Sequence, residues 1–289
     1  MASVNQQKQP TAAVTGAGGG LGRDIALGLA AKDYRVFGTA LSPQEVNDLK
    51  NASDGAVNLS QCDITDEAAV RNWVREVVAQ TGGGLDLLIS NAGVLTPGPL
   101  EVLPLSSVRR EFEVNVFGVL AVVNAFLPAL RKHGGRIVQV STWTASLPLP
   151  FNGPSGASKA AMEAFAAVYR AELKSFGIEV VIAAAGNMKT GGPAKTASAL
   201  KRLADSMNSE QHELYGEAFE KFELTLNKMQ STGLDSESAA KRVIELAEQK
   251  PAPSRAAVGE DAEEILRLVR EKSNAEQDEI RLRMAGLKA

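Results

Sequence analysis

The chain has 289 residues, of which 44% are hydrophobic and 22% charged, with a formal net charge of −3. This composition suits one large globular domain, and the lack of a basic excess argues against nucleic-acid binding. Cys62 is the one cysteine, which excludes an internal disulfide and predicts a reducing, cytoplasmic location. The longest apolar run, residues 114–130, is broken by Pro128 and three other residues, so we expect a buried helix and no membrane span.

Short apolar runs alternate with helical patterns over the first two thirds of the chain. This β-α alternation predicts a doubly wound parallel sheet, a Rossmann-like α/β fold, with strands buried on both faces. The predicted strands are residues 11–15, 35–40, 56–61, 85–90, 136–141 and 178–184. The predicted helices are residues 21–31, 43–51, 66–80, 106–132 and 155–176.

The pattern loosens after Gly186. Helices are predicted at residues 197–207, 210–230 and 236–249, followed by a strand at 255–258 and a charged helical tail. The simplest organisation is a single domain. We predict a flexible tail over residues 1–9, a dinucleotide-binding core over 10–187, and a helical substrate-side elaboration over 188–289.

A glycine-rich turn lies between the first predicted strand and helix. Glycines there let the backbone approach a pyrophosphate, which the unpaired N–H groups of the following helix can bind. The residues of this expected cradle are Gly16, Gly18, Gly20, Leu21 and Gly22. The spacing Thr-Gly-x-x-x-Gly-x-Gly is similar to that of the short-chain dehydrogenase/reductase family.

Further motifs resemble the same family over residues 10–190. They are Asp63 after Cys62, the turn Asn91-Ala92-Gly93, Asn115 in Asn-Val-Phe-Gly, and Lys159 in Ser-Gly-Ala-Ser-Lys. The last resembles Tyr-x-x-x-Lys, with Ser155 where the family has its tyrosine. The resemblance implies an NAD(P)(H)-dependent oxidoreductase that interconverts an apolar secondary alcohol and a ketone. The remainder of the chain resembles, more weakly, the branch that handles steroids and retinoids.

The resemblance also implies the catalytic residues, which would be Asn115, Ser141, Thr142, Ser155 and Lys159. In the family the tyrosine is the acid and base, the lysine lowers its pKa, and a hydroxyl thirteen positions earlier orients the substrate oxygen. Ser155 weakens this chemistry, because an aliphatic hydroxyl is far less acidic than a phenol. The space left by the smaller side chain has two interpretations, a water held by Ser155, Thr142 and Lys159 that relays the proton, or a pocket enlarged for a bulkier ligand. We also expect Ser155 to cap the following helix.

The resemblance also implies which cofactor binds and which residues contact it. The end of the second strand carries Leu41 in place of both the acid that favours NAD and the usual arginine, and we favour NADP(H) over NAD(H). The full expected set is Gly16, Gly18, Gly20, Leu21, Gly22, Leu41, Asp63, Asn91, Ala92, Gly93, Lys159, Gly186 and Thr190.

A small apolar substrate is expected above the carboxyl ends of the strands. The candidate lining residues are Trp143, Leu147, Phe151, Met188 and Tyr215, although the apolar ones suit ordinary packing equally well. No metal site is predicted, because the two histidines lack companion ligands. By resemblance, helices beginning near Ser106 and Ser155 would pack across two-fold axes in a homodimer or homotetramer.

Three functions remain open from the sequence. The first is the oxidoreductase just described, weakened by Ser155. The second is an enzyme repurposed for isomerisation, dehydration or cyclisation, motivated by Leu41, Thr142, Ser155 and Ala185 near one site. The third is a non-catalytic binding protein.

Overall fold

Seven parallel strands form the central sheet of the computed structural model, which describes residues 9–189 and 192–288. The strand order is β3-β2-β1-β4-β5-β6-β9, and the direction of winding reverses between β1 and β4. The strands are β1 (Thr11–Val14), β2 (Arg35–Ala40), β3 (Val57–Gln61), β4 (Leu87–Ser90), β5 (Arg136–Thr142), β6 (Glu179–Ala185) and β9 (Arg255–Val258). The predicted doubly wound α/β fold is confirmed, and the reversal marks the edge where ligands of such folds bind.

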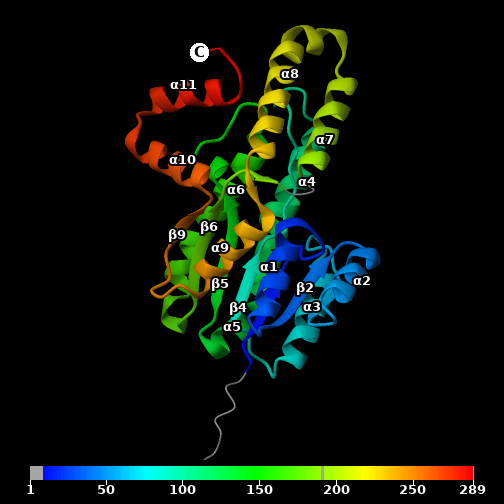
Figure 1. The fold of residues 1–289 in the computed structure, drawn as a ribbon, viewed down its shortest axis with the longest axis vertical. Coiled ribbons are helices and arrows are strands. Elements are labelled where there is room, and N and C mark those ends of the chain that lie inside the picture. The colour runs from blue at the N-terminus through cyan, green and yellow to red at the C-terminus, as the bar shows by residue number, and fades with distance from the viewer. Residues whose placement is uncertain (1–8, 190–191, 289) are drawn as a thin grey trace, which may run out of the picture.

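Helices cover both faces of the sheet (Figure 1). One hydrophobic cluster joins the sheet to α1 (Gly20–Ala31), α2 (Pro43–Ala52) and α9 (Ser236–Glu248). The other joins it to α3 (Glu67–Gln80), α5 (Val119–His133) and α6 (Gly153–Glu172). In the second cluster the ring of Trp73 meets Phe126 edge to face, with centroids 5.0 Å apart. Most strand residues are buried because both faces are covered, as their apolar sequences predict.

The long apolar stretch before β5 is interrupted by a π-helix. Helix α4 (Leu105–Phe112) runs into the π-helical segment η1 (Glu113–Gly118) and then into α5. The run Leu105–His133 is long and apolar enough to cross a membrane, but 61% of its most apolar window is buried inside the protein. The predicted single helix is therefore three segments. Because π-turns are rare and cluster at functional sites, this interruption directs attention to Asn115 within it.

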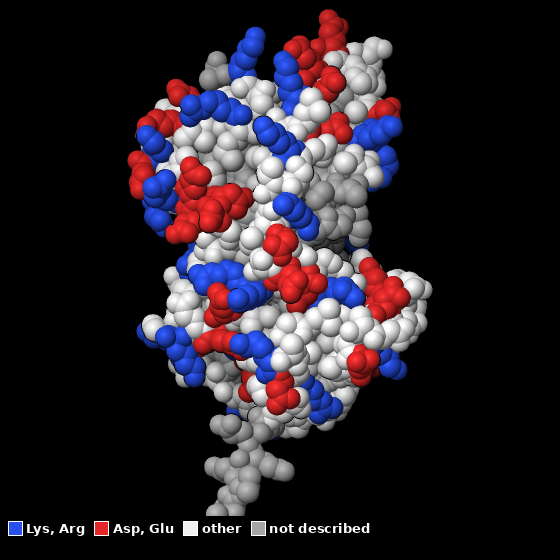
Figure 2. All heavy atoms as spheres, viewed as in Figure 1, with Lys and Arg blue, Asp and Glu red and all other residues white. Residues whose placement is uncertain are grey.

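Of the C-terminal third, α9 and β9 belong to the body of the sheet, and the other helices lie beyond its carboxyl end (Figure 1). Its further elements are β7 (Met188–Lys189), α7 (Gly192–Ser206), α8 (Ser209–Ser231), β8 (Leu234–Asp235), α10 (Glu260–Glu271) and α11 (Asn274–Met284), with β7 and β8 forming a small parallel pair. Two satellite clusters attach this part to the loop after β5, one through α10 and α11 and the other through α7 and α8. On the face drawn in Figure 2, Lys and Arg side chains are interspersed with Asp and Glu.

Candidate functional site

The glycine-rich turn between β1 and α1 is built for close backbone approach. Gly16 and Gly20 have φ of 65° and 53°, a region that favours glycine. A Cβ on Gly22 would lie 2.2 Å from the Gly16 carbonyl oxygen, whereas a Cβ on Gly19 would meet nothing within 4 Å. Helix α1 begins after Gly19 without a side-chain cap. Its first N–H groups are therefore available to an anion on the open side of the turn.

The turn is joined to the end of β4 through Thr15. The hydroxyl of Thr15 accepts hydrogen bonds from the backbone N–H groups of Asn91 and Ala92, at 2.9 and 3.0 Å. The side-chain amide of Asn91 donates to the Thr15 carbonyl at 3.0 Å. The predicted cofactor residues Gly16, Asn91 and Ala92 are thus brought together at the switch point of the sheet.

A carboxylate of α2, which the sequence reasoning missed, folds back onto the end of β2. Leu41 is 65% exposed, and the carboxylate of Glu45 accepts hydrogen bonds from the N–H groups of Leu41 and Ser42, at 3.0 and 3.3 Å. Glu45 also lies against Gly18, where an added Cβ would be 2.9 Å from its Oε2. The signal was present as the capping box of α2, a serine followed three residues later by glutamate.

Asp63 lies at the end of β3 and is held in place by two neighbours. Thr65 donates to it from its backbone N–H and its hydroxyl, at 2.9 and 2.8 Å, and Arg110 of α4 forms an ion pair at 3.3 Å. Partial burial raises the pKa of Asp63, but these hydrogen bonds and the guanidinium outweigh it and leave the pKa below its usual value. Asp63 is therefore ionised at neutral pH, and its hydrogen bonds and ion pair hold the carboxylate in place.

Asn115 is the centre of a buried polar network. Its side chain accepts from the backbone N–H of Val94 at 2.8 Å and donates to the Val94 carbonyl at 2.9 Å. The same Nδ2 lies 3.0 Å from Ser158 Oγ and 3.3 Å from Glu111 Oε1, so its two hydrogens are shared among three acceptors. The π-turn of η1 and helix α6 are thereby fixed to the segment after β4.

Lys159 lies beside Gly93, as Asn115 does. A Cβ on Gly93 would be 3.2 Å from Asn115 Oδ1 and 3.3 Å from Lys159 Nζ, so this glycine leaves room for both groups. Lys159 Nζ donates to the Val140 carbonyl at 3.1 Å. Burial lowers the pKa of Lys159 to about 8, against the opposing effect of Glu111 and Glu163. The ammonium can therefore exchange its proton close to neutral pH.

The hydroxyl residues beside Lys159 have different surroundings. Ser141 donates to Glu163 Oε1 at 2.7 Å, so it is engaged away from a ligand. Thr142 Oγ1 accepts from the N–H and hydroxyl of Thr144, each at 3.4 Å, which leaves its own hydrogen available. Ser155 is 8% exposed, on the first turn of α6.

The expectation that Ser155 caps α6 is wrong. The helix begins at Gly153, and its N-cap is Asn152. Pro154 is at the start of the helix, where its fixed φ and missing N–H are tolerated, and this places Ser155 inside the first turn. Its backbone carbonyl accepts a hydrogen bond from Ser158 Oγ at 3.1 Å, as expected within a helix.

The loop after β6 is anchored by the C-terminal part of the chain. Asp261 at the start of α10 accepts from the backbone N–H and side-chain amide of Asn187, at 2.8 and 3.0 Å. A Cβ on Gly186 would overlap the same carboxylate, 1.9 Å from Oδ1. The predicted contact Thr190 lies outside the described residues.

The candidate substrate-lining residues separate into groups. Trp143 and Leu147 are buried in the cluster with α10 and α11, and Met188 is half-buried beside the sheet. Phe151 packs edge to face on Phe219 and Phe222 of α8, with ring centroids 5.7 and 5.5 Å apart. The hydroxyl of Tyr215 on α8 donates to Glu101. Phe151 and Tyr215 thus take part in contacts that join α8 to the rest of the molecule, and Met229 of α8 packs on the cluster of Trp143 and Leu147.

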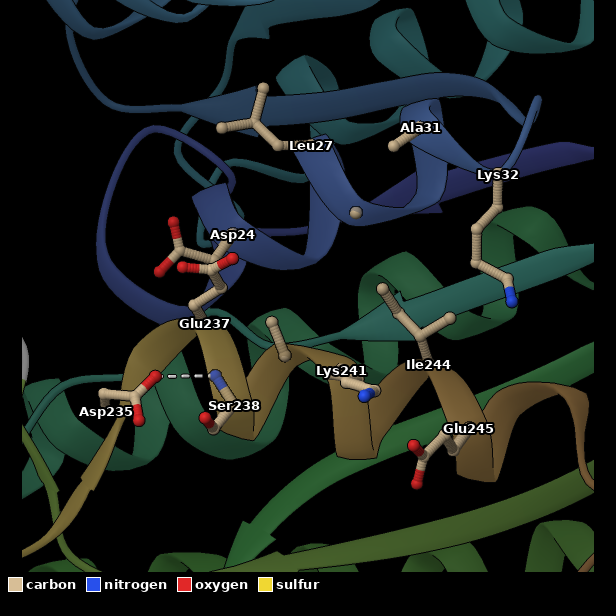
Figure 3. Close-up of a pocket in the computed structure, with 12 residues that line it drawn as sticks. Asp24, Leu27, Ala31, Lys32, Asp235, Glu237, Ser238, Lys241, Ile244 and Glu245 are labelled. Atoms are coloured by element: carbon tan, nitrogen blue, oxygen red, sulfur yellow. Dashed lines mark hydrogen bonds between the residues drawn. The ribbon is translucent and has the colours of Figure 1, made fainter.

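A groove of about 870 Å³ lies elsewhere, between α1 and α9 (Figure 3). Its floor includes the apolar side chains of Leu27 and Ile244, and charged residues such as Asp24 and Lys241 stand at its edges. None of the predicted site residues is among those that line it. The groove belongs to the outer helix layer and is separate from the carboxyl end of the sheet.

The residues at the carboxyl end of the sheet fit a dinucleotide. The crowding around Gly16 and Gly22, the open side of Gly19 and the uncapped start of α1 make a cradle for a pyrophosphate. Lys159 and Asn115 lie further along the same edge, beside Gly93. Among the residues that the structure describes, no three His, Cys, Asp or Glu side chains gather as a metal site.

Comparison with known proteins agrees with this geometry. A sequence model of the short chain dehydrogenase family matches residues 10–201, more than half of the chain. The chain is 37% identical over 186 residues to the uncharacterized oxidoreductase YusZ of Bacillus subtilis, covering 62% of this chain and 65% of that protein, just under two thirds of its length. It is 30% identical to the NADPH-dependent 3-dehydrocapnine reductase of Ornithobacterium rhinotracheale, over 81% of this chain and 82% of that protein.

A solved structure shares the whole arrangement. The short-chain dehydrogenase from Streptomyces avermitilis superposes with a TM-score of 0.79 and is 27% identical. The match covers 95% of this chain and 96% of that one, so it includes the C-terminal helices as well as the sheet.

Proposed function

The chain belongs to the short-chain dehydrogenase family of oxidoreductases, and from this premise we propose that it interconverts an apolar secondary alcohol and a ketone with NADP(H). The observation that carries the proposal is the placement of Asn115 and Lys159 together beside Gly93, at the edge where the glycine-rich turn would hold a dinucleotide. The bound nicotinamide would supply or accept the hydride. Residues 10–187 would bind the cofactor, and residues 188–289 would cover the substrate.

The chain's own residues would manage the substrate oxygen and its proton. Thr142, whose hydroxyl hydrogen is available, would donate to that oxygen and orient it. Lys159 would hold the nicotinamide ribose and, together with Ser155, a water that passes a proton to the oxygen during reduction. The water is required because an aliphatic hydroxyl at position 155 is too weak an acid near neutral pH.

Support for NADP(H) and for an apolar substrate comes from separate observations. The 3-dehydrocapnine reductase, 30% identical to this chain, is by name NADPH-dependent. Phe151 packs on the buried rings of Phe219 and Phe222, so the part of the chain proposed to cover the substrate meets the loop before α6 through apolar side chains. Glu45 argues against NADP(H), because its carboxylate occupies the backbone N–H groups at the end of β2 that a 2′-phosphate would use.

We further propose a homodimer or homotetramer in the cytoplasm. Phe117 on η1 and Phe165 on α6 are 56% and 42% exposed, and Val168, three residues after Phe165, is 50% exposed. Large apolar side chains exposed along neighbouring helices are typical of an interface between protein chains.

The decisive experiment compares the protein with its Ser155→Tyr variant in NADPH- and NADH-dependent turnover of a panel of apolar ketones. We expect the tyrosine to raise turnover by about 10²–10⁴-fold, the usual contribution of a positioned acid. Ser155→Phe is the matched control, since it fills the same volume without a phenol and should bring no gain. No cofactor turnover by any of the three proteins would contradict the oxidoreductase proposal.

The alternative is non-redox chemistry on this scaffold. Ser155 favours it, because the position that supplies the family's acid no longer does so. Product formation from the same panel without oxidation of NADPH would support isomerisation, dehydration or cyclisation. Ligand binding without any product would support a binding protein.

A further inference from the structure

Glu111 on α4 is a fully buried carboxylate that the proposed reaction leaves without a role. Its Oε2 accepts a hydrogen bond from the backbone N–H of Thr96 at 2.8 Å, and its Oε1 accepts from Asn115 Nδ2 at 3.3 Å. Both partners are donors, and an ionised carboxylate can accept at both oxygens, whereas an acid or an amide offers one good acceptor. The hydrogen bonding therefore favours the charged form, which burial opposes.

The cation that acts on Glu111 is Lys159. Burial raises the pKa of Glu111 to about 7, although the Thr96 hydrogen bond and Lys159 lower it. Glu111 in turn acts on Lys159 and opposes the effect of burial on that ammonium. Asn115 donates to Glu111 and shares the space beside Gly93 with Lys159, so the two ionisable groups lie near the same amide, and each favours the charged form of the other.

A second carboxylate near Lys159 is differently placed. Glu163 on α6 also favours the charged form of Lys159, but it pairs with Arg255 at 3.0 Å and accepts from Ser141. Its charge is thereby balanced by a permanent cation. Glu111 is the carboxylate whose charge is matched by Lys159 itself.

We propose that Glu111 is a positioning residue of this site, which orients Asn115 by hydrogen bonding and keeps Lys159 protonated by its charge. The inference rests on the proposed function, in which Lys159 holds the relay water and the cofactor ribose. Glu111 itself touches neither substrate nor cofactor. It acts through Lys159 and Asn115.

The proposal has a direct consequence for pH. Glu111 is ionised above about pH 7, and Lys159 is protonated below about pH 8. The charged pair is therefore most populated between these two values and declines on either side. In the acid direction Asn115 also loses one of its acceptors, because Glu111 then carries a proton.

The test is an NMR titration of the free protein, which needs neither cofactor nor turnover. The Lys159 side-chain resonance, identified by its absence in Lys159→Met, is followed against pH in the protein and in Glu111→Gln. We expect the Lys159 midpoint to fall by about one pH unit in Glu111→Gln, as removal of a nearby opposite charge implies. Glu113→Gln, the same change at an exposed position two residues along, should leave the midpoint unchanged.

A reciprocal measurement keeps the test valid if Glu111→Gln does not fold. In Lys159→Met the carboxyl resonance of Glu111 should titrate at higher pH than in the unmodified protein, by a comparable amount. An unchanged Lys159 midpoint in folded Glu111→Gln, or an unchanged Glu111 midpoint in Lys159→Met, would overturn the inference. Coupled titrations in a protein that turns over no ketone would overturn the proposed function alone.

Discussion

Lys159 Nζ, on helix α6, donates a hydrogen bond of 3.1 Å to the carbonyl of Val140 on strand β5. The lysine is therefore held by the backbone of the sheet and does not depend on the residue at position 155 for its place. This explains how the chain keeps an ordered ammonium although Ser155 precedes it by one helical turn. A phenol introduced at position 155 would meet a lysine that is already in position.

Cofactor affinity should depend on pH through Lys159 and Glu111. We expect NADPH to bind most tightly between about pH 7 and pH 8, where the ammonium and the carboxylate are both charged. Affinity should fall on the alkaline side as Lys159 loses its proton and on the acid side as Glu111 gains one. Fluorescence titrations with NADPH at a series of pH values measure the affinity. In Lys159→Met the fall in affinity on the alkaline side should disappear.

Burial of Glu111 should make the unfolding free energy of the protein depend on pH. The folded-state pKa, about 7, is above the ordinary value of 4.5, so the folded state binds the proton more tightly than the unfolded state. Between pH 5 and pH 8 the unfolding free energy of the protein should fall by about 2 kcal/mol more than that of Glu111→Gln. Urea unfolding at the two pH values measures this difference. A Glu113→Gln protein should follow the parent, and equal pH dependence in Glu111→Gln would contradict the expectation.

Glu45 should weaken the binding of a 2′-phosphate. Glu45→Gln removes the charge while retaining a residue that suits a capping box, so α2 should keep its start. We expect NADPH affinity to rise by about tenfold and NADH affinity to change little. Calorimetry with both cofactors decides the point, with Asp48→Asn on the exposed side of α2 as the control. A larger gain in affinity for NADH than for NADPH would refute the idea that Glu45 weakens binding of the 2′-phosphate.

The glycine-rich turn provides a matched pair of substitutions. Gly22→Ala places a Cβ 2.2 Å from the Gly16 carbonyl oxygen, so the turn must open and NADPH binding should be lost. Gly19→Ala adds the same methyl where the free protein has nothing within 4 Å. We expect Gly19→Ala to keep its fold and melting temperature, and circular dichroism with NADPH titration compares the two. Equal effects of both changes on the melting temperature would argue against the steric explanation.

The exposed rings on η1 and α6 should govern assembly. Phe165→Glu introduces a charge among the apolar side chains of that surface and should shift an oligomer toward the monomer. Leu224→Glu is a control on α8, where the leucine is 65% exposed and distant in sequence from the proposed interface. Sedimentation velocity reports the mass of each variant. A parent protein that is itself monomeric would remove the basis of this prediction.

The sheet could be predicted from the sequence because its strands are short apolar runs. Residues 35–40 were predicted as a strand with the same bounds as β2, and residues 136–141 fall one short of β5. The division of the long helix could not be predicted, because a π-turn depends on tertiary packing and has no sequence signature comparable to a cap. The start of α6 was misplaced by two residues, since Pro154 suits the first turn as well as the position before it.

The site was predicted less completely than the sheet. Motif spacing singled out Asn115 and Lys159, and the structure brings both to Gly93. Glu45 and Glu111 were missed for different reasons. Glu45 acts through a local cap that the sequence did contain, whereas Glu111 acts on residues 15 positions before it and 48 after it. Charged residues on amphipathic helices are usually exposed, and nothing in the sequence distinguishes the exception.

Because a π-helix joins α4 to α5, the number of residues in this segment determines where its polar side chains lie. A π-turn contains one residue more than an α-turn, so deletion of a single residue such as Phe117 would let the helix become regular without breaking it. Each residue of an α-helix turns it by about 100°, and the deletion would rotate Glu111 and Asn115 together away from Ser158 while α5 stayed in the core. The chain could thus keep its fold and lose its polar network through a change in length alone.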